Sequence, residues 1–396
     1  MLDKADKIKH LLTRNVEEVI DRAHLEKALT SGKKLRVKLG IDPTGDKIHI
    51  GRAVILWKLR EFQDLGHKII LIIGDFTAQI GDPSDKLEKR PFLSPSQIKK
   101  NLKNYLPQVG KILDLKKTEI CYNGEWLKKL NFQKIAELAE SFTMQQMLKR
   151  RNFAERLEKG QDINLRETFY PLMQGYDSVA VKADVELGGT DQLFNLLAGR
   201  KIQEQYNMKP QDVLLTGMLT GLDGRKMSTS WGNVINIMDS AREQYGKIMS
   251  MHDNLIGEYL HLATDINEVE IKKIEQDILR NVMSPKHAKE QVAFGVVSRY
   301  YGEESALRAA EEFDKLFVKN DLSASKLPEI SLPPNANLLS LLVHAGAAES
   351  NSAARRLIEQ GAVRINDEVK SDPNEPLKIK SGSVLKVGKH KFFRIR

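Results

Sequence analysis

The sequence predicts an α/β protein whose first half forms a doubly wound parallel sheet, followed by an α-helical region and a small basic module. A short strand at 35–41, a helix at 50–65 and an apolar run at 68–74 together form one βαβ unit, which is typical of such sheets. From 238 to 318 the pattern is helical throughout. A proline-marked linker at 327–337 then precedes the basic end of the chain.

Turn residues bound the strands of the predicted sheet. The strand from Leu35 to Ile41 ends at Asp-Pro-Thr-Gly, a cluster of turn-forming residues. The run from Lys68 to Gly74 is almost entirely apolar, as expected of a strand that is covered on both faces. Further strands are expected at 184–187 and 213–215, with a helix at 191–206 between them.

The composition excludes several classes of protein. A chain of 396 residues is long enough for two or three domains, and its longest apolar run, 69–73, is far shorter than the ~20 residues of a membrane helix. Cys121 is the only cysteine, which excludes a disulfide framework and a cysteine-based zinc site. The first ten residues are charged and lack the apolar stretch of a secretory signal. We therefore expect a cytoplasmic protein with no membrane partner and no metal site of its own.

Positive charge is concentrated near the end of the chain. The formal net charge is +9, and residues 335–396 hold 11 Lys/Arg against 6 Asp/Glu, which leaves +5 there. A compact basic module indicates a polyanionic partner, and nucleic acid is favoured over a membrane surface. A solvated basic face without a partner is the plainer alternative.

The first candidate site is the segment Asp42-Pro-Thr-Gly-Asp-Lys-Ile-His-Ile-Gly-Arg52, between the first strand and its helix. The unpaired N–H groups at the start of a helix attract phosphate. Gly51 would let an adenine ring lie against the backbone, and His49 could donate to phosphate oxygens. Considered alone, an accidental tetrapeptide with a histidine at a helix start is the commoner explanation.

The second candidate site is the glycine-rich loop from Gly221 to Ser230, with Lys226 at its centre. Glycines provide conformational freedom and lysine a movable charge, which suits a triphosphate, although such a loop alone is more often plain surface. The two segments lie about 180 residues apart. Together they resemble the paired ATP-binding signatures of the class I aminoacyl-tRNA synthetases.

Further segments narrow the resemblance to the tyrosyl-tRNA synthetases over essentially the whole chain. They lie in the family's order and spacing at 38–44, 62–67, 74–84, 170–177 and 185–192. The segment 353–366 resembles the S4 RNA-binding domain that closes bacterial members of the family. The resemblance implies a Rossmann-like catalytic domain at 1–235, an α-helical anticodon-binding domain at 236–326 and a small α+β S4-like domain at 335–396.

The resemblance also implies the reaction, in which ATP and L-tyrosine form tyrosyl-adenylate and the tyrosyl group then moves to tRNA(Tyr). The tyrosine carboxylate is already ionised at neutral pH, so its attack on the α-phosphorus needs no protein nucleophile. Catalysis would then consist of positioning and charge stabilisation. ATP is expected as a substrate that carries its own Mg²⁺. A homodimer is also expected, with its interface around 142–157, although the apolar stripe there is equally compatible with core.

Site residues follow from the resemblance, position by position. The residues expected to act on the phosphates during catalysis are Thr44, His49, Arg52, Lys86, Arg90, Lys226 and Thr229. ATP would also be bound by Asp42, Gly51, Gly188, Gly189, Asp191, Gln192, Lys226, Met227 and Ser228. Tyrosine would be bound by Lys38, Gly40, Thr77, Asp82, Tyr170, Gln174, Asp177 and Gln192, with Asp82, Tyr170 and Gln174 at the α-ammonium and Asp177 at the phenol hydroxyl. The spacing of Tyr170, Gln174 and Asp177, at i, i+4 and i+7, predicts that they share one face of a helix. RNA phosphates would be bound by Arg355, Arg356, Arg364, Lys386, Lys389 and Lys391.

Three positions depart from the family pattern. Arg52 stands where His or Asn is common, Thr229 where a second Lys is common, and Lys38 where many relatives have a Tyr that touches the phenol hydroxyl. Arg52 and Arg225 add cations that would compensate for Thr229. Two alternatives stay open: activation of another aromatic amino acid, chiefly tryptophan, and a non-catalytic RNA-binding relative that kept the scaffold. Asp177 and the S4-like segment favour tyrosine.

Overall fold

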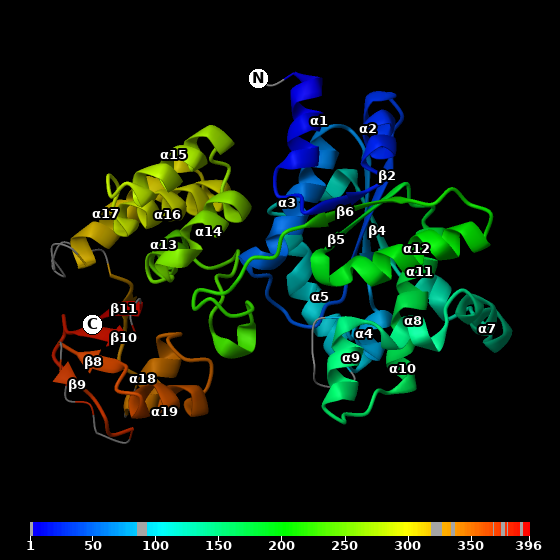
Figure 1. Cartoon of the computed structure of the whole chain (residues 1–396). Helices are drawn as coiled ribbons and strands as arrows, with labels where there is room; N and C mark the ends of the chain where they lie inside the picture. Colours follow the sequence, from blue (N-terminus) through cyan, green and yellow to red (C-terminus); the bar gives the residue numbers. More distant parts are fainter. Residues whose placement is uncertain are drawn as a thin grey trace. The chain divides into compact units, whose positions relative to one another are not determined.

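A six-stranded sheet forms the centre of the first half of the chain in the computed structural model (Figure 1). All neighbouring strands are parallel except β1, which pairs antiparallel with β6. The predicted doubly wound α/β fold is thereby confirmed. In sheet order, the strands are β1 (Glu18–Ile20), β6 (Asp212–Thr216), β5 (Val185–Gly189), β2 (Arg36–Ile41), β3 (Lys68–Ile73) and β4 (Thr118–Tyr122).

Contacts divide the chain into two compact units. The first contains Met1–Met238 and Asn254–Asp277, and the second contains Asp239–Asp253 and Ile278–Arg396. The structure describes residues 3–84, 93–317, 327–333, 337–366, 368–373, 377, 379–388 and 391–396.

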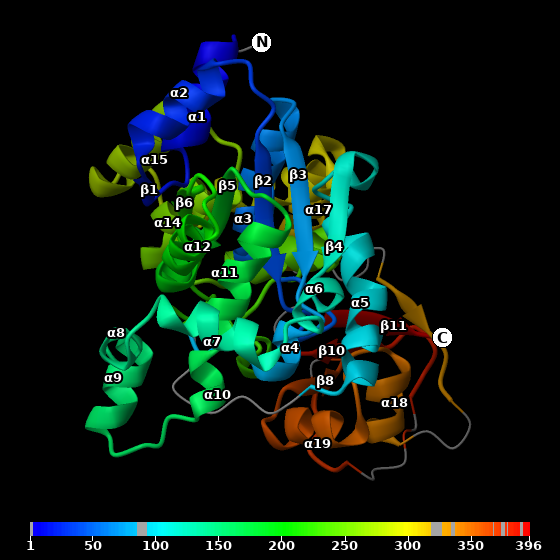
Figure 2. The same cartoon turned by 90° about the vertical axis from the view of Figure 1, so that its right-hand side faces the viewer.

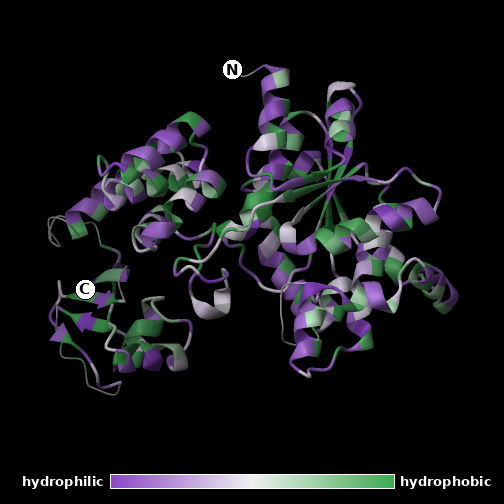
Figure 3. Cartoon of the chain, in the orientation of Figure 1, coloured by the Kyte–Doolittle hydropathy of each residue, from purple (hydrophilic) through white to green (hydrophobic). Residues whose placement is uncertain are grey.

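The strands of the sheet form the apolar core of the first unit. Ile69 to Ile73 of β3 are completely buried, and the strands are mainly apolar in the hydropathy colouring (Figure 3). β2, β3 and β4 lie side by side in register (Figure 2). β1 and β4 were not predicted from the sequence. β1 has only three residues, too few for a periodic signal, and every residue of β4 is only half-buried.

Helices surround this sheet. The predicted helix at 50–65 is α3 (Ile50–Asp64), and the predicted helix at 191–206 is α12 (Leu193–Gln205) after a short 3₁₀ turn at Thr190–Gln192. The other helices before the second unit are α1 (Lys4–Thr13), α2 (Arg22–Thr30), α4 (Thr77–Ile80), α5 (Pro95–Val109), α6 (Gly124–Leu127), α7 (Phe132–Glu140), α8 (Met144–Leu148), α9 (Arg151–Glu158), α10 (Leu165–Thr168) and α11 (Tyr170–Ala180).

The direction of strand addition reverses between β2 and β5. From β2 the chain adds β3 and β4 on one side, and it then adds β5 and β6 on the other. Doubly wound sheets bind their ligands at the carboxyl ends of the strands that flank such a reversal. β2 ends directly before Asp42 and β5 directly before Thr190, so this edge carries residues from both the ATP and the tyrosine sets.

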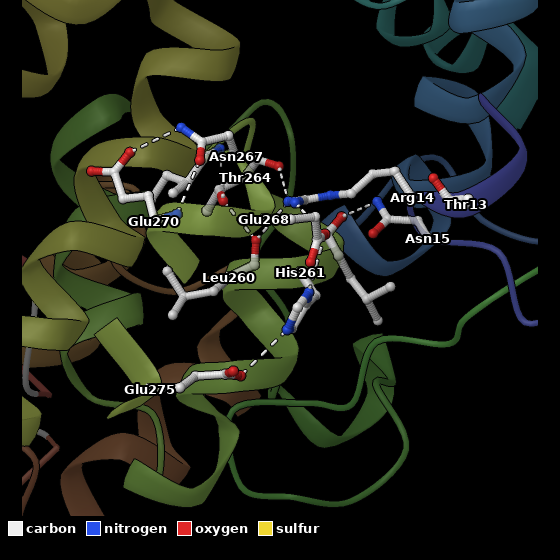
Figure 4. A network of polar contacts seen from close by, with 12 residues as sticks. Thr13, Arg14, Asn15, Leu260, His261, Thr264, Asn267, Glu268, Glu270 and Glu275 are labelled. Atoms are coloured by element: carbon white, nitrogen blue, oxygen red, sulfur yellow. Dashed lines mark hydrogen bonds and ion pairs between the residues drawn. The ribbon is translucent and has the colours of Figure 1, made fainter. Parts of the chain in front are cut away.

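Arg14 joins the end of α1 to helices α14 (Ile256–Ala263) and α15 (Glu268–Leu279), as Figure 4 shows. Its buried guanidinium donates to the carbonyls of Leu260 at 3.0 Å and Thr264 at 3.1 Å, and it pairs with Glu268 at 2.7 Å. The last carbonyls of a helix lack partners within the helix, so a cation there stabilises its end. The predicted helical stretch 236–326 is therefore divided, because α14 belongs to the unit of the large sheet.

The second unit combines a group of three helices with a small sheet. The helices are α13 (Ala241–Met249), α16 (Pro285–Tyr301) and α17 (Glu303–Phe317). A separate apolar core joins α18 (Leu338–His344) and α19 (Asn351–Glu359) to the sheet. The sheet order is β7 (Glu329–Ile330), β11 (Lys391–Ile395), β10 (Val384–Val387), β8 (Val363–Ile365) and β9 (Glu368–Val369).

Two further findings concern the predicted organisation. The expected linker at 327–337 is not entirely irregular, because its residues Glu329–Ile330 form β7, which pairs in parallel with β11. In the part of the chain that is described, every helix falls short of the length and apolar character needed to cross a membrane.

Candidate active site

The first signature forms the turn from β2 into α3. His49 is the N-cap of α3, where its Nδ1 accepts from the backbone N–H of Arg52 at 3.3 Å. The Arg52 side chain turns back and donates to Thr44 Oγ1 at 3.2 Å. The start of α3 therefore presents an imidazole, a guanidinium and a hydroxyl beside the N–H groups of its first turn, and this combination suits an anion.

His49 is neutral at physiological pH. Its burial, and then the positive charges of Arg52 and Lys226, lower the pKa of the imidazole to about 3. Because Nδ1 accepts a hydrogen bond, the single ring proton resides on Nε2. His49 can thus donate one hydrogen bond from Nε2 without carrying a charge.

The second signature and the segment that follows it lie against the first signature. The backbone N–H of Ile50 donates to the Ile235 carbonyl at 2.8 Å, and that of Ile237 donates to the Ile48 carbonyl at 2.9 Å. A side chain at Gly51 would meet the Met227 sulfur at 3.0 Å. The absence of a Cβ at Gly51 therefore lets the Met227 side chain lie against the start of α3.

Asn233 holds the loop of the second signature in shape. Its Oδ1 accepts from the N–H of Ser228 at 2.8 Å, and its Nδ2 donates to the Lys226 carbonyl at 3.1 Å and to Asp223 at 2.8 Å. With this backbone fixed, Lys226 and Thr229 are exposed to solvent. The loop thus combines a hydrogen-bonded frame with an exposed lysine side chain.

Arg225, the proposed compensating cation, is itself engaged. Its Nε donates to Asp223 at 2.8 Å, and its guanidinium carbon lies 4.8 Å from the centre of the Trp231 ring. The pairing with Arg225 and the hydrogen bond from Asn233 hold the pKa of Asp223 well below its usual range. In this arrangement Arg225 stabilises the loop, whereas Arg52 lies within the first signature.

A chain of hydrogen bonds runs from the first signature into the expected tyrosine site. Asp42 accepts from Thr77 Oγ1 at 2.7 Å through Oδ1 and from the Tyr170 hydroxyl at 3.0 Å through Oδ2. Asn123 donates to Thr77 Oγ1 at 3.0 Å and to Asp177 Oδ2 at 3.3 Å. Asp42, which is expected to bind ATP, thus directly contacts Thr77 and Tyr170, which are expected to bind tyrosine.

Asp177 is buried and held from two sides. Trp126 Nε1 donates to its Oδ1 at 2.7 Å, and Asn123 binds Oδ2. Burial raises the pKa of Asp177 to about 7, against the opposing effects of the Lys38 charge and of these two donors. The carboxyl group is therefore close to half-ionised at neutral pH in the absence of a substrate.

A second buried carboxylate, Asp82, lies in a polar cluster. Its Oδ2 accepts from Gln192 at 2.7 Å, and its Oδ1 accepts from the Ser84 backbone N–H at 2.9 Å. Asn195 donates to Gln192 Oε1 at 2.9 Å, and Arg150 donates to Asn195 Oδ1 at 3.1 Å. Asp82 and Gln192, both expected with tyrosine, are therefore in direct contact.

The remaining expected site residues of the first unit lie close to these groups along the chain. Tyr170, Gln174 and Asp177 are all on α11, as predicted. Gly188 and Gly189 end β5, and Asp191 lies in the 3₁₀ turn that follows. Gly40 lies in β2, and a Cβ there would meet open space. Lys38 is fully buried and bonded within the protein.

The basic residues expected to bind RNA lie in the second unit. Arg355 and Arg356 are exposed on α19. Arg364 is exposed on β8 and is the register partner of Lys386 on β10. Lys391 donates to the Ala347 carbonyl at 3.0 Å. Three expected site residues, Lys86, Arg90 and Lys389, lie outside the described residues.

Several residues of the site were not among those expected from the sequence. Asn123 and Trp126 come from the connection after β4, so only the folded sheet brings them to Asp177. Glu186 lies inside the segment 185–192 that the motifs already marked, whereas Asn233 lies three residues after the end of the second signature. Asn195 follows Gln192 by three residues, and this helical spacing is a signal that the sequence did contain.

Comparisons with known proteins agree with this geometry. A family model described as tRNA synthetases class I (W and Y) matches residues 30–318, and one described as Tyrosine--tRNA ligase SYY-like C-terminal domain matches residues 320–395. The chain is 46% identical over 386 residues to the tyrosine–tRNA ligase of Thermotoga maritima, covering 97% of this chain and 96% of the relative. It is 46% identical over 391 residues to that of Moorella thermoacetica, covering 97% and 94%.

Two solved structures share the fold. The C-terminally truncated mitochondrial tyrosyl-tRNA synthetase of Aspergillus nidulans has a TM-score of 0.64 at 23% identity, covering 78% of this chain and 94% of that one. The enzyme of Archaeoglobus fulgidus, solved with L-tyrosine, has a TM-score of 0.61 at 21% identity, covering 78% and 99%. The chain therefore belongs to the tyrosine–tRNA ligases, class I aminoacyl-tRNA synthetases that use ATP to attach L-tyrosine to tRNA(Tyr) through tyrosyl-adenylate.

Proposed function

We propose that tyrosyl-adenylate forms at the carboxyl ends of β2 and β5, where the first signature meets α11. The observation that supports this proposal is the hydrogen-bonded chain from Asp42 through Thr77 and Asn123 to Asp177. It links the phosphate-binding turn to the carboxylate at the proposed phenol position. One rigid network would thus position both substrates, as adenylate formation requires.

In this proposal tyrosine is held at both ends. Asp177 accepts from the phenol hydroxyl, while Asp82, the Tyr170 hydroxyl and Gln174 accept from the α-ammonium. Trp126 already occupies one oxygen of Asp177 and orients the carboxylate. Phenylalanine would leave this buried acceptor without its partner, and an unmet buried polar group is costly.

The ATP phosphates meet neutral and charged donors. His49 donates from Nε2, Arg52 and Thr44 act as a bonded pair, and Lys226 approaches the leaving diphosphate. A mobile lysine that engages charge developing in the transition state raises the rate of the chemical step. Mg²⁺ would arrive bound to ATP.

The proposal is tested by ATP–pyrophosphate exchange with tyrosine, phenylalanine or tryptophan in the absence of tRNA. Exchange with tyrosine alone is expected in the wild type. Asp177→Asn should raise the KM for tyrosine and leave the KM for ATP within about twofold. The matched variant Asp64→Asn alters an exposed aspartate of α3 that pairs with Arg60 at the surface, and it should change neither. Equal effects of both variants would contradict the assignment of Asp177.

The tRNA is proposed to place its anticodon stem at the helical stretch 236–326, of which α13, α16 and α17 lie in the second unit, and its phosphates at the S4-like part of that unit. Arg355, Arg356 and Arg364 are exposed on neighbouring elements of that part. Contacts to phosphates release counterions, so binding should weaken as salt increases. Replacing Arg355 and Arg356 by Gln together should lower the slope of log K against log salt by about two. An unchanged slope would remove them from the interface.

A homodimer is proposed from the exposed apolar side chains of α7 to α10. Phe132, Met144, Leu157 and Leu165 are each about half exposed or more, with Phe132 at 87%, whereas Phe153 of the predicted stripe is buried and belongs to the core. Exposed apolar groups of this kind mark contact surfaces. Phe132→Glu should convert dimers to monomers in light scattering at micromolar concentration.

We also place the protein in the cytoplasm, where a lone half-buried Cys121 stays reduced.

A further inference from the structure

Lys38 and Glu186 form a buried ion pair against helix α11. They are register partners on the neighbouring parallel strands β2 and β5. The Lys38 ammonium lies 3.1 Å from Glu186 Oε1, and the two side chains are 0% and 1% exposed. Withdrawing two charges from water is unfavourable unless good geometry and further hydrogen bonds compensate for it. The structure therefore has to supply further partners for both groups.

Those partners lie mostly on α11. Lys38 Nζ donates to the Gln174 carbonyl at 3.0 Å and to Ser178 Oγ at 2.6 Å. Glu186 Oε1 accepts from the Gln174 side chain at 3.1 Å, and Oε2 accepts from Ser178 at 3.3 Å. Oε2 also accepts from Gln211. The ion pair thus holds one face of the helix that carries the proposed tyrosine-binding residues.

The bonding of Lys38 changes its expected role. An ammonium group has three protons, and here the three partners Gln174, Ser178 and Glu186 account for all of them. No proton remains for a phenol oxygen. Lys38 replaces the tyrosine found in many relatives without taking over its contact to the substrate, and Asp177 is left to accept from the phenol.

Glu186 determines the orientation of the Gln174 amide. An ionised carboxylate only accepts hydrogen bonds, so the NH₂ group of Gln174 must face it. The amide oxygen then points away from Glu186. We propose that Glu186, with Lys38 as its counter-charge, is a positioning residue that presents the Gln174 carbonyl oxygen to the α-ammonium of tyrosine. The inference rests on the proposed placement of that ammonium at Gln174.

Two double variants with the same net charge test this inference in the full-length enzyme. Lys38→Met with Glu186→Gln removes both charges but keeps an acceptor for the Gln174 amide. Lys38→Met with Glu186→Leu removes the acceptor as well. The matched control is Lys58→Met with Glu61→Leu. It deletes another lysine–glutamate pair of the first unit, at 2.7 Å, in which the lysine is buried and also binds the Leu11 carbonyl, and the glutamate is 25% exposed.

The readouts separate positioning from folding. The Glu186→Leu double variant should have a KM for tyrosine about tenfold or more above that of the Glu186→Gln double variant, with similar kcat and similar KM for ATP. The inhibition constant of 3-(4-hydroxyphenyl)propionate, which lacks the ammonium, should be the same for both. The Lys58 control should leave the KM for tyrosine at the wild-type value.

Three outcomes would overturn the inference. Equal KM values for tyrosine in the two double variants would overturn the positioning role of Glu186. Equal losses for tyrosine and for the analogue without the ammonium would also overturn it, because they indicate general damage to the site. If Gln174→Ala left the KM for tyrosine at the wild-type value, the placement of the ammonium at Gln174 would be wrong, and the inference would fail with it.

Discussion

The pKa of Asp177 predicts that tyrosine binding depends on pH near neutrality. Burial raises the pKa of this carboxyl to about 7 in the free protein. The ionised form accepts from the phenol hydroxyl, whereas protonation places a proton on one of the two oxygens and removes the charge. Tyrosine affinity should therefore fall as the pH drops through 7.

The magnitude follows from the ionised fraction. With a pKa of about 7, roughly 90% of Asp177 is ionised at pH 8 and roughly 10% at pH 6. If only the ionised form binds, the dissociation constant for tyrosine rises about tenfold between these values, which corresponds to about 1.4 kcal/mol. A carboxyl group at its ordinary pKa would stay ionised over the whole range and would produce no change.

Equilibrium dialysis with labelled tyrosine in the absence of ATP is the direct assay, because it avoids the titration of the triphosphate. His49 does not interfere, since its pKa of about 3 keeps it neutral from pH 6 to 8. The control is Asp177→Asn with tyrosine, which should be independent of pH in this range. A flat profile for the wild type with tyrosine would refute the reasoning.

Four further variants address other parts of the site and fold. Arg52→Met should slow adenylate formation about 100-fold in single-turnover experiments, because it removes a cation from the first signature. Arg225→Ala should slow it less, because Arg225 pairs with Asp223. The opposite order would make Arg225 the compensating cation. Asn233→Ala should raise the KM for ATP about tenfold without changing the dissociation constant for tyrosine, because it releases the loop around Lys226. Equal changes for both substrates would instead indicate that the whole active site is disrupted. Arg14→Met should lower the free energy of unfolding of the first unit by about 2–4 kcal/mol in urea denaturation, because the carbonyls of Leu260 and Thr264 lose a charged donor. ATP–pyrophosphate exchange should be unchanged, and a loss of activity at unchanged stability would contradict this reasoning.

Local patterns in the sequence were sufficient to predict the elements that carry the site. Apolar runs bounded by turn residues predicted β2 and β3, and β3, whose residues Ile69 to Ile73 are completely buried, had the strongest signal. The spacing of Tyr170, Gln174 and Asp177 predicted their common helix. These features depend on residues close in the chain, for which periodicity is informative.

Contacts between distant segments were beyond such patterns. The donors to Asp177 come from residues 123 and 126, more than 50 positions away, and Arg14 binds a helix that lies about 250 residues further on. Which strands become neighbours decides these contacts, and the sequence does not state the strand order. The division of the helical stretch between the two units has the same origin.

The Lys38 position shows how a departure from a family pattern can be compensated elsewhere. In the sequence it indicates the loss of a residue that touches the phenol. In the fold, Lys38 lies opposite Glu186, and the two charges pair beneath the helix that bears Gln174 and Asp177. Recognition of the phenol then depends on Asp177, a carboxylate buried deeply enough that its pKa approaches 7. The same burial that would make this acceptor selective for a hydroxyl therefore makes tyrosine binding sensitive to pH, and the positive charge of Lys38 limits that sensitivity by favouring the ionised form.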